Sequence, residues 1–178
     1  MHRMLRRLRL LVVLLAAVTA FTACVGGSSR GPAASAGAGS GSGAGPEAVI
    51  YAYNERSKEK DLEGMADLFT YPAVFSAAVP GLEEDREQTI ANRDELIAYF
   101  RDEVFAYIGT IYDMQVTILD IQIAGDTAII QVEVSQDVEN VALGRAKALV
   151  RNVVQLKRIG GQWYISHLHT QELRPVDA

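Results

Sequence analysis

Apolar residues recur every three to four positions in the first half of the patterned region, which is the spacing of an amphipathic α-helix. The segment NRDELIAYFRDEVFAYIG, residues 92–109, shows this spacing best. It predicts a helix with Asn92 as N-cap and Gly109 as the stop. A second helix is predicted after Pro46, because proline suits the first turn. A third, shorter helix is predicted after Asp61, a residue type favoured as N-cap.

From about residue 110 the period changes to two, which indicates β-strands. The connections AGDT, ALG and IGGQ are typical of hairpins, and the segment TYPAVFSAAVPGL, residues 70–82, is expected to be extended and rich in turns. Helices followed by a meandering antiparallel sheet predict an α+β fold. The strands are predicted near residues 111–123, 127–141, 145–159 and 162–173.

The chain begins with the pattern of a bacterial export signal. Four arginines lie among the first nine residues, a short apolar run follows from Leu10 to Val18, and small residues lead to Cys24. The run is shorter than the ~20 residues that a membrane-spanning helix needs. The segment FTAC resembles a lipobox, in which the cysteine of a bacterial lipoprotein is lipidated with acyl chains such as palmitate. Phe21 departs from the usual aliphatic residue there, and cleavage after Ala20 is the alternative.

These features divide the chain into a lipoprotein-type signal over residues 1–23, a tether over 24–46 and a globular domain over 47–178. The tether is rich in Gly, Ala and Ser, so it cannot bury a core and is expected to be flexible. Lipidation of Cys24 would anchor the domain in the cell envelope, on the outer side of the cytoplasmic membrane or in the periplasm. Since Cys24 is the only cysteine, no internal disulfide is expected.

The charge of the chain argues against nucleic acid as a partner. The sequence has 17 basic and 22 acidic residues, and loss of residues 1–23 removes four arginines and no acid. The mature chain would then carry 13 basic and 22 acidic residues, a charge of −9. A charge of this sign disfavours phosphate backbones and polybasic docking onto anionic lipid.

The order of predicted elements, with the segments DLFTYPAVF, TIANRDEL and GGQWYISHLHTQ, resembles the NTF2-like superfamily, above all its SnoaL-like and ketosteroid-isomerase-like branches. The resemblance covers about residues 47–174. It implies a cone in which a curved sheet wraps around helices and encloses a pocket. Members of the superfamily include isomerases, cyclases, dehydratases, ligand binders and oligomerisation modules, so the fold alone does not decide the function.

Strand pairing predicts where the two C-terminal histidines point. If Gly160 and Gly161 form a two-residue hairpin loop, His167 lies opposite Val154 and His169 lies opposite Asn152. Both histidines then share the apolar face with Trp163 and Ile165. The pattern therefore places His167, His169, Asn152 and Trp163 at the pocket, although a structural role in the core is the alternative for each.

The same pairing around Gly125 and Asp126 places Asp113 opposite Val138, at the polar end of an otherwise apolar inner face. That inner face would contain Leu119, Ile121 and Ile123, so Asp113 becomes the fifth candidate pocket residue. On the opposite face, acidic residues 133, 137 and 139 are expected to face basic residues 145, 147 and 151 as a solvated charge ladder.

Two functions remain open on this evidence. One is a non-catalytic domain that binds a small apolar ligand or a partner protein, with a homodimer possible through the sheet. The other is a SnoaL-like or isomerase-like enzyme in which His169 moves a proton and Asn152 or an inner tyrosine stabilises an oxyanion. Binding is favoured, because no second titratable group is found to act with His169. No metal site is expected, since two histidines lack further ligands, and no cofactor is expected.

Overall fold

One curved sheet of six strands wraps around the helices in the computed structural model, which describes residues 45–77, 86–141 and 144–176. The helical segments are α2 (Glu47–Glu59), α3 (Leu62–Ala66) and α4 (Arg93–Tyr99), with a π-turn (Phe100–Val104) and a 3₁₀ turn (Phe105–Tyr107). The strands are β1 (Phe69–Ala77), β2 (Arg86–Ile90), β3 (Ile108–Ala124), β4 (Thr127–Asn140), β5 (Gly144–Ile159) and β6 (Gln162–Pro175). The predicted signal, and the tether up to residue 44, lie outside the described residues.

The strand order is β2-β1-β6-β5-β4-β3, and the last four strands form the predicted antiparallel meander. The α+β cone is therefore confirmed, with one correction: β1 pairs with β6 in parallel, so the sheet is mixed. Strand β2 was not predicted from the sequence. A parallel pairing needs a long crossover, and here the chain from β2 to β5 supplies it.

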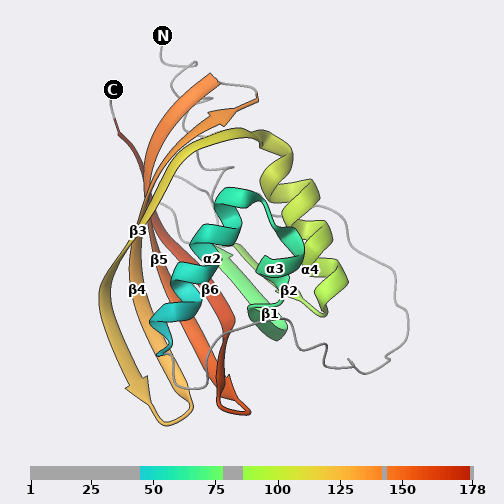
Figure 1. The fold of residues 1–178 in the computed structure, drawn as a ribbon, viewed down its shortest axis with the longest axis vertical. Coiled ribbons are helices and arrows are strands. Elements are labelled where there is room, and N and C mark those ends of the chain that lie inside the picture. The colour runs from blue at the N-terminus through green and yellow to red at the C-terminus, as the bar shows by residue number, and fades with distance from the viewer. Residues whose placement is uncertain (1–44, 78–85, 142–143, 177–178) are drawn as a thin grey trace.

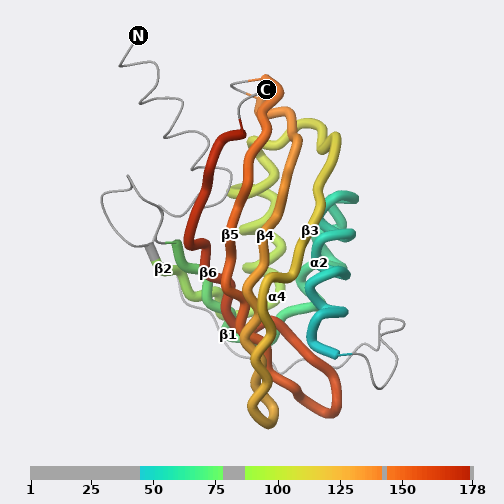
Figure 2. The backbone as a smooth tube through the Cα atoms, turned by 90° about the vertical axis from the view of Figure 1, so that its left-hand side faces the viewer, coloured from blue at the N-terminus to red at the C-terminus, as the bar shows by residue number. Residues whose placement is uncertain are grey.

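All helical segments lie on the concave side of the sheet (Figure 1), and α2 runs beside the edge strand β3 (Figure 2). The core lies between the two layers. Its largest fully buried side chains include Phe100, Met65, Leu96, Leu156 and Ile165. The core therefore joins residues from the helical half of the chain to residues from the strand half.

The predicted helix caps are confirmed. The side chain of Asn92 accepts a hydrogen bond from the backbone N–H of Glu95 at 3.0 Å, and that of Asp61 accepts one from Gly64 at 2.9 Å. The carboxylate of Glu95 in turn accepts from the N–H of Ala91 at 2.9 Å. These bonds satisfy N–H groups that have no partner within the helix.

The helix predicted over residues 92–109 does not remain regular to Gly109. It is α-helical only to Tyr99 and then widens into the π-turn. A wider turn brings Val104 and Phe105 toward the interior, where both line a cavity, whereas Tyr107 is left 37% exposed. No helix among the described residues is long and apolar enough to cross a membrane.

Candidate functional site

A cavity of about 150 Å³ lies inside the cone, between α2, the segment from α4 to the 3₁₀ turn, and strands β3 to β6. Most of its wall is aliphatic or aromatic. Its polar lining side chains are Asn54, Ser57, Gln136 and Asn152, together with two tyrosines. A concave, mostly apolar space with a few convergent polar groups is the usual form of a small-molecule site.

An aromatic cluster builds one wall of the cavity. The ring of Phe75 lies 5.1 Å from that of Tyr99 and 6.1 Å from that of Phe100, measured between centroids. Phe69 stacks on Phe75 from behind at 5.4 Å, and Tyr53 lies 6.3 Å from Phe100. Because aromatic pairs at these distances attract one another, the wall is held by contacts among its own members.

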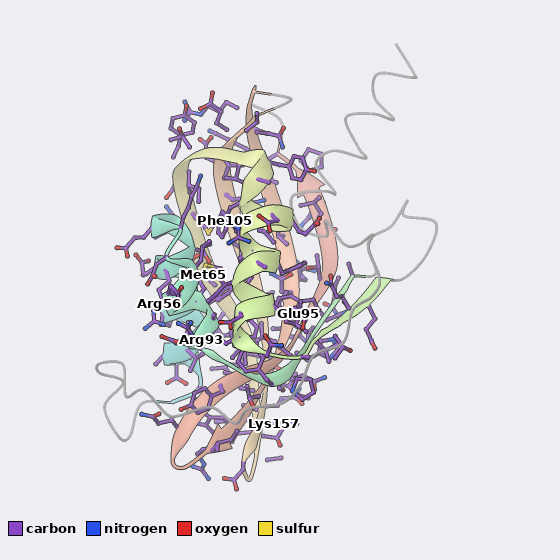
Figure 3. All side chains as sticks on the ribbon, turned by 90° about the vertical axis from the view of Figure 1, so that its right-hand side faces the viewer. Arg56, Met65, Arg93, Glu95, Phe105 and Lys157 are labelled. Carbon is purple, nitrogen blue, oxygen red and sulfur yellow. The ribbon has the colours of Figure 1, made fainter. Side chains whose placement is uncertain are left out.

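The helix side of the cavity is shown in Figure 3, where Met65 lies behind α4 and next to α2. Met65 is buried and lines the cavity, and its Sδ lies 3.8 Å from Oγ of Ser57. Arg93 holds α4 to α3 through ion pairs with Glu63 at 2.5 Å and Asp67 at 2.8 Å. The helical wall is therefore fixed at its base.

Some polar side chains of the cavity have hydrogen-bond partners within the described part of the protein, and one buried oxygen atom does not. The amide Nδ2 of Asn54 donates to the carbonyl of Met114 at 3.4 Å, and the hydroxyl of Ser57 donates to the carbonyl of Tyr53 at 2.7 Å. In contrast, Oδ1 of Asn152 is buried and has no hydrogen-bond partner among the described residues. Such an acceptor costs about 1–3 kcal/mol in a folded protein.

The titratable groups that line the cavity within the described residues are two tyrosines. Burial raises the pKa of Tyr99 to about 12, and the carboxylate of Glu103 adds to the shift. Burial also raises the pKa of Tyr53 far above its usual range, with a further contribution from Tyr99. Both phenols are therefore neutral hydrogen-bond donors at physiological pH. No carboxylate, imidazole or amine stands among the described lining residues.

The predicted direction of the two histidines is wrong, because β6 contains a bulge. Leu156 pairs with Ile165 as predicted, but the next residue of β5, Gln155, pairs with His167. Ser166 is the extra residue. A one-residue shift moves every later side chain to the other face of a strand. Leu168 therefore lines the cavity, and His167 and His169 lie on the opposite face of the sheet.

On that outer face, the hydroxyl of Ser76 connects the two histidines. Its Oγ lies 2.7 Å from Nε2 of His167 and 2.8 Å from Nδ1 of His169, so it can donate to one ring and accept from the other. Burial lowers the pKa of His167, and the nearby His169 adds to this effect, while Glu87 opposes it. From this face His169 cannot exchange a proton with a molecule inside the cone.

Two further candidates also lie away from the cavity. Asp113 pairs with Asp137 rather than Val138, because β3 has an extra residue, Leu119, between Ile118 and Asp120. The carboxylate of Asp113 is exposed and accepts a hydrogen bond from Gln115 at 3.0 Å. Trp163 does share the inner face with Ile165 and packs against the core, but it does not line the cavity. Among the five candidates, only Asn152 is a lining residue.

Three of the polar lining residues, Asn54, Ser57 and Tyr99, were missed by the sequence reasoning, although the pattern of α2 indicated two of them. Asn54 and Ser57 follow Ile50 at four and seven positions in α2, so they occupy the apolar stripe of that helix and are buried. A polar residue at a position that the helical period assigns to the core is a sign of a polar contact inside. Tyr99 left no such signal, since an aromatic residue on an apolar stripe is ordinary.

The predicted charge ladder is confirmed on the outer face of β4 and β5. Register places Glu133 opposite Arg151 and Asp137 opposite Lys147. The closest ion pairs join Asp137 to Arg145 at 2.8 Å and Glu133 to Arg151 at 3.0 Å. Within the described residues, no group of three or more His, Cys, Asp or Glu is placed to hold a metal ion.

Solved structures with the same architecture show what this cone is similar to. A ketosteroid isomerase-like protein from Erwinia carotovora atroseptica is 21% identical over 74% of this chain and 94% of its own, with a TM-score of 0.57. A putative dehydratase of the NTF2-like family from Streptomyces avermitilis is 19% identical over 74% and 94%, with a TM-score of 0.53. At these identities the likeness shows the fold alone.

An NTF2-like protein of unknown function from Shewanella baltica is 16% identical over 75% of this chain and 92% of its own, with a TM-score of 0.50. No match is found among curated protein sequences. The family model of the SnoaL-like domain matches residues 47–170, which include nearly all of the cone. The chain therefore belongs to the SnoaL-like domain family and has the NTF2-like fold.

Proposed function

We propose that this protein is a lipid-anchored binding protein of the cell envelope, whose cone holds a small, uncharged and largely apolar molecule. The observation that carries the proposal is the neutral lining of the cavity, in which the only titratable groups among the described residues are two tyrosines with raised pKa values. A charged ligand would lose its hydration in such a space without gaining an opposite charge.

The size of the cavity limits the ligand. Its volume of about 150 Å³ is similar to that of an engineered apolar cavity, described for another protein, that holds one benzene molecule. The ligand would therefore be about the size of one substituted ring. The aromatic wall around Phe75 suits the flat face of such a ring.

The free acceptor on Asn152 defines one further property of the ligand. Its Oδ1 has no partner among the described residues, so a ligand with a hydroxyl or N–H group at that point would satisfy it. The phenols of Tyr53 and Tyr99 line the same space as neutral donors. The ligand is thus expected to be an apolar ring with at least one donor.

The envelope location is supported by the arginine-rich start, the apolar run and the position of Cys24. Mass spectrometry of the mature N-terminus tests it. A diacylated or triacylated Cys24 is the expected result, and an unmodified terminus at Phe21 would contradict the anchor. The same sample, sprayed under native conditions, would reveal a molecule that co-purifies with the cone.

A pair of probes that differ by one donor tests the cavity itself. The mature protein is titrated with p-cresol and with toluene, and the two dissociation constants are compared by calorimetry. We expect p-cresol to bind more tightly by roughly 2–10-fold, the usual value of one neutral hydrogen bond. In Asn152→Leu this preference should vanish, while toluene binds at least as well as before.

Gln155→Leu is the matched control, because Gln155 lies on the outer face of the same strand and is exposed. It should leave both constants unchanged. Failure of both probes to bind the wild-type protein, or an equal preference in Asn152→Leu, would contradict the proposed site.

A further inference from the structure

One end of the sheet leaves a group of large apolar side chains exposed. This hairpin end consists of residues 119–129, around the turn between β3 and β4, and residues 157–163, around the turn between β5 and β6. Three of its side chains come from the edge strand β3: Leu119, Ile121 and Ile123 are 46%, 37% and 57% exposed. Ile129 and Ile159, also exposed, extend the apolar surface to the outer face.

The β3 side chains are exposed because β3 is the edge strand, and not because the strand pairing turns them to the outer face. Ile121 pairs with Ile130 and Ile123 pairs with Ala128, and both partners are fully buried on the inner face. The two β3 side chains therefore point to the covered side of the sheet but lie where its cover ends. Water contacts aliphatic surface that the fold itself does not bury.

The chain leaves the domain at this same end. The first turn of α2, which begins at Glu47, lies toward the same end of the sheet as the two hairpin turns in two perpendicular views (Figures 1 and 2). The residues between Cys24 and Glu47 number 22, and a Gly/Ser-rich chain of that length spans roughly 25 Å on average. A lipid on Cys24 would thus hold the hairpin end closer to the bilayer than the opposite end of the sheet.

We infer that the hairpin end docks onto the lipid bilayer, an inference that rests on the proposed lipid anchor. A lipid anchor keeps the hairpin end close to the bilayer, which raises the effective concentration of one for the other. A small apolar contact is therefore enough for the anchored protein to bind the bilayer surface. A second copy fits this surface less well. Leu119 is the extra residue of a bulge in β3, and bulges in edge strands obstruct edge-to-edge pairing between chains.

The charges at the hairpin end indicate what kind of bilayer contact forms. Asp120 and Asp126 balance Lys157 and Arg158, and Arg158 forms an ion pair with Asp126 at 2.8 Å. This end therefore has no excess of positive charge to attract anionic headgroups. Docking depends on the apolar side chains, and we expect it on zwitterionic lipid and at high salt alike.

The only tryptophan of the chain can report the contact. Trp163 lies at the hairpin end, is half-buried, and stacks under the guanidinium of Arg158 at 5.3 Å from the ring centroid. The full-length chain is produced with its own signal, and the mature protein is reconstituted in phosphatidylcholine vesicles with or without brominated acyl chains. We expect brominated lipid to quench the emission of Trp163.

The double substitution Ile121→Asp/Ile123→Asp should abolish the quenching, and Ile123→Asp alone should reduce it. Both variants should still float with the vesicles, because Cys24 is unchanged. Val141→Asp is the matched control: Val141 is 71% exposed and lies beyond the end of β4, at the opposite end of the sheet. It should quench like the wild-type protein.

Three results would overturn the docking. The first is wild-type protein that floats with the vesicles but whose Trp163 emission is not quenched. The second is equal quenching in Ile121→Asp/Ile123→Asp and the wild-type protein. The third is a wild-type dimer in light scattering that becomes monomeric in Ile121→Asp/Ile123→Asp. Failure of the anchor is recognised separately, as an unmodified N-terminus. Unlipidated protein is then titrated with concentrated vesicles, and quenching that is lost in the Asp variants would still support the docking, whereas no quenching would overturn it.

Discussion

The two faces of β6 carry different chemistry although their residues alternate along one strand. The inner face contributes Ile165 and Leu168 to a cavity whose described lining residues include no base and no permanent charge. The outer face carries His167 and His169, joined by one serine hydroxyl of β1. The difference teaches that the two histidines of the domain are separated from the cavity by the thickness of the sheet.

The largest expected difference between the inner and outer faces is in the free energy of unfolding that is lost when a side chain is truncated to alanine. Leu156 is fully buried on the inner face of β5, whereas its neighbour Lys157 is exposed. We expect Leu156→Ala to lower the free energy of unfolding by about 2–5 kcal/mol, because it removes buried methyl groups and leaves a void. Lys157→Ala should change it by less than about 0.5 kcal/mol. Urea unfolding of both variants measures the contrast, and equal costs would mean that the two faces are not distinct.

A substitution inside the cavity is expected to raise the free energy of unfolding instead of lowering it. Asn152→Leu replaces an unsatisfied buried acceptor with an apolar group of similar shape, so we expect the free energy of unfolding to rise by about 1 kcal/mol. Asn152→Ala is the control, since it removes the acceptor without filling the space and should gain less. A clear loss of stability in Asn152→Leu would show that Oδ1 already has a partner. A gain would mean that the protein keeps Asn152 at a cost, as a binding residue would be kept.

The smallest expected effect is a loss of stability at acidic pH that arises from His167 on the outer face. Burial lowers the pKa of His167 below its usual value of 6.5, so the unfolded chain binds a proton more readily than the folded one. This contribution to stability is complete above pH 6.5 and is lost as the pH falls through the lower folded value.

The melting temperature, compared between pH 7.5 and pH 5.5, tests this sign. The wild-type protein should lose more on acidification than His167→Gln, in which the titrating ring is gone. If the two proteins respond alike, His167 is not held in its neutral form by the outer face.

Much of the fold could be predicted from local patterns. The helix caps at Asp61 and Asn92, and the strands β3 to β6, follow from residue preferences and from the change of period near residue 110. The register of β4 and β5 was also predicted, because it depends on one turn and the alternation of acidic and basic residues. Each of these features is encoded within a few neighbouring positions.

The candidate site could not be predicted in the same way. One extra residue, Ser166, reverses the direction of both histidines, and its hydroxyl donates to the carbonyl of Gln155 at 3.2 Å across the strands. The local sequence around Ser166 does not distinguish it from a regular strand residue. Asn152 was placed at the pocket through a pairing with His169 that does not form, and it lines the cavity because of its own position on β5.

The sequence by itself determined the class of fold, the extent of the main elements and the apolar interior, since these follow from period and composition. The tertiary structure decided that β1 joins β6 in parallel, that the bulges turn Asp113 and the histidines outward, and that Asn54 and Asn152 line one cavity. Those outcomes depend on contacts between residues far apart in the chain. A local pattern contains no information on them, because the free energy of such contacts arises only when the distant segments pack together.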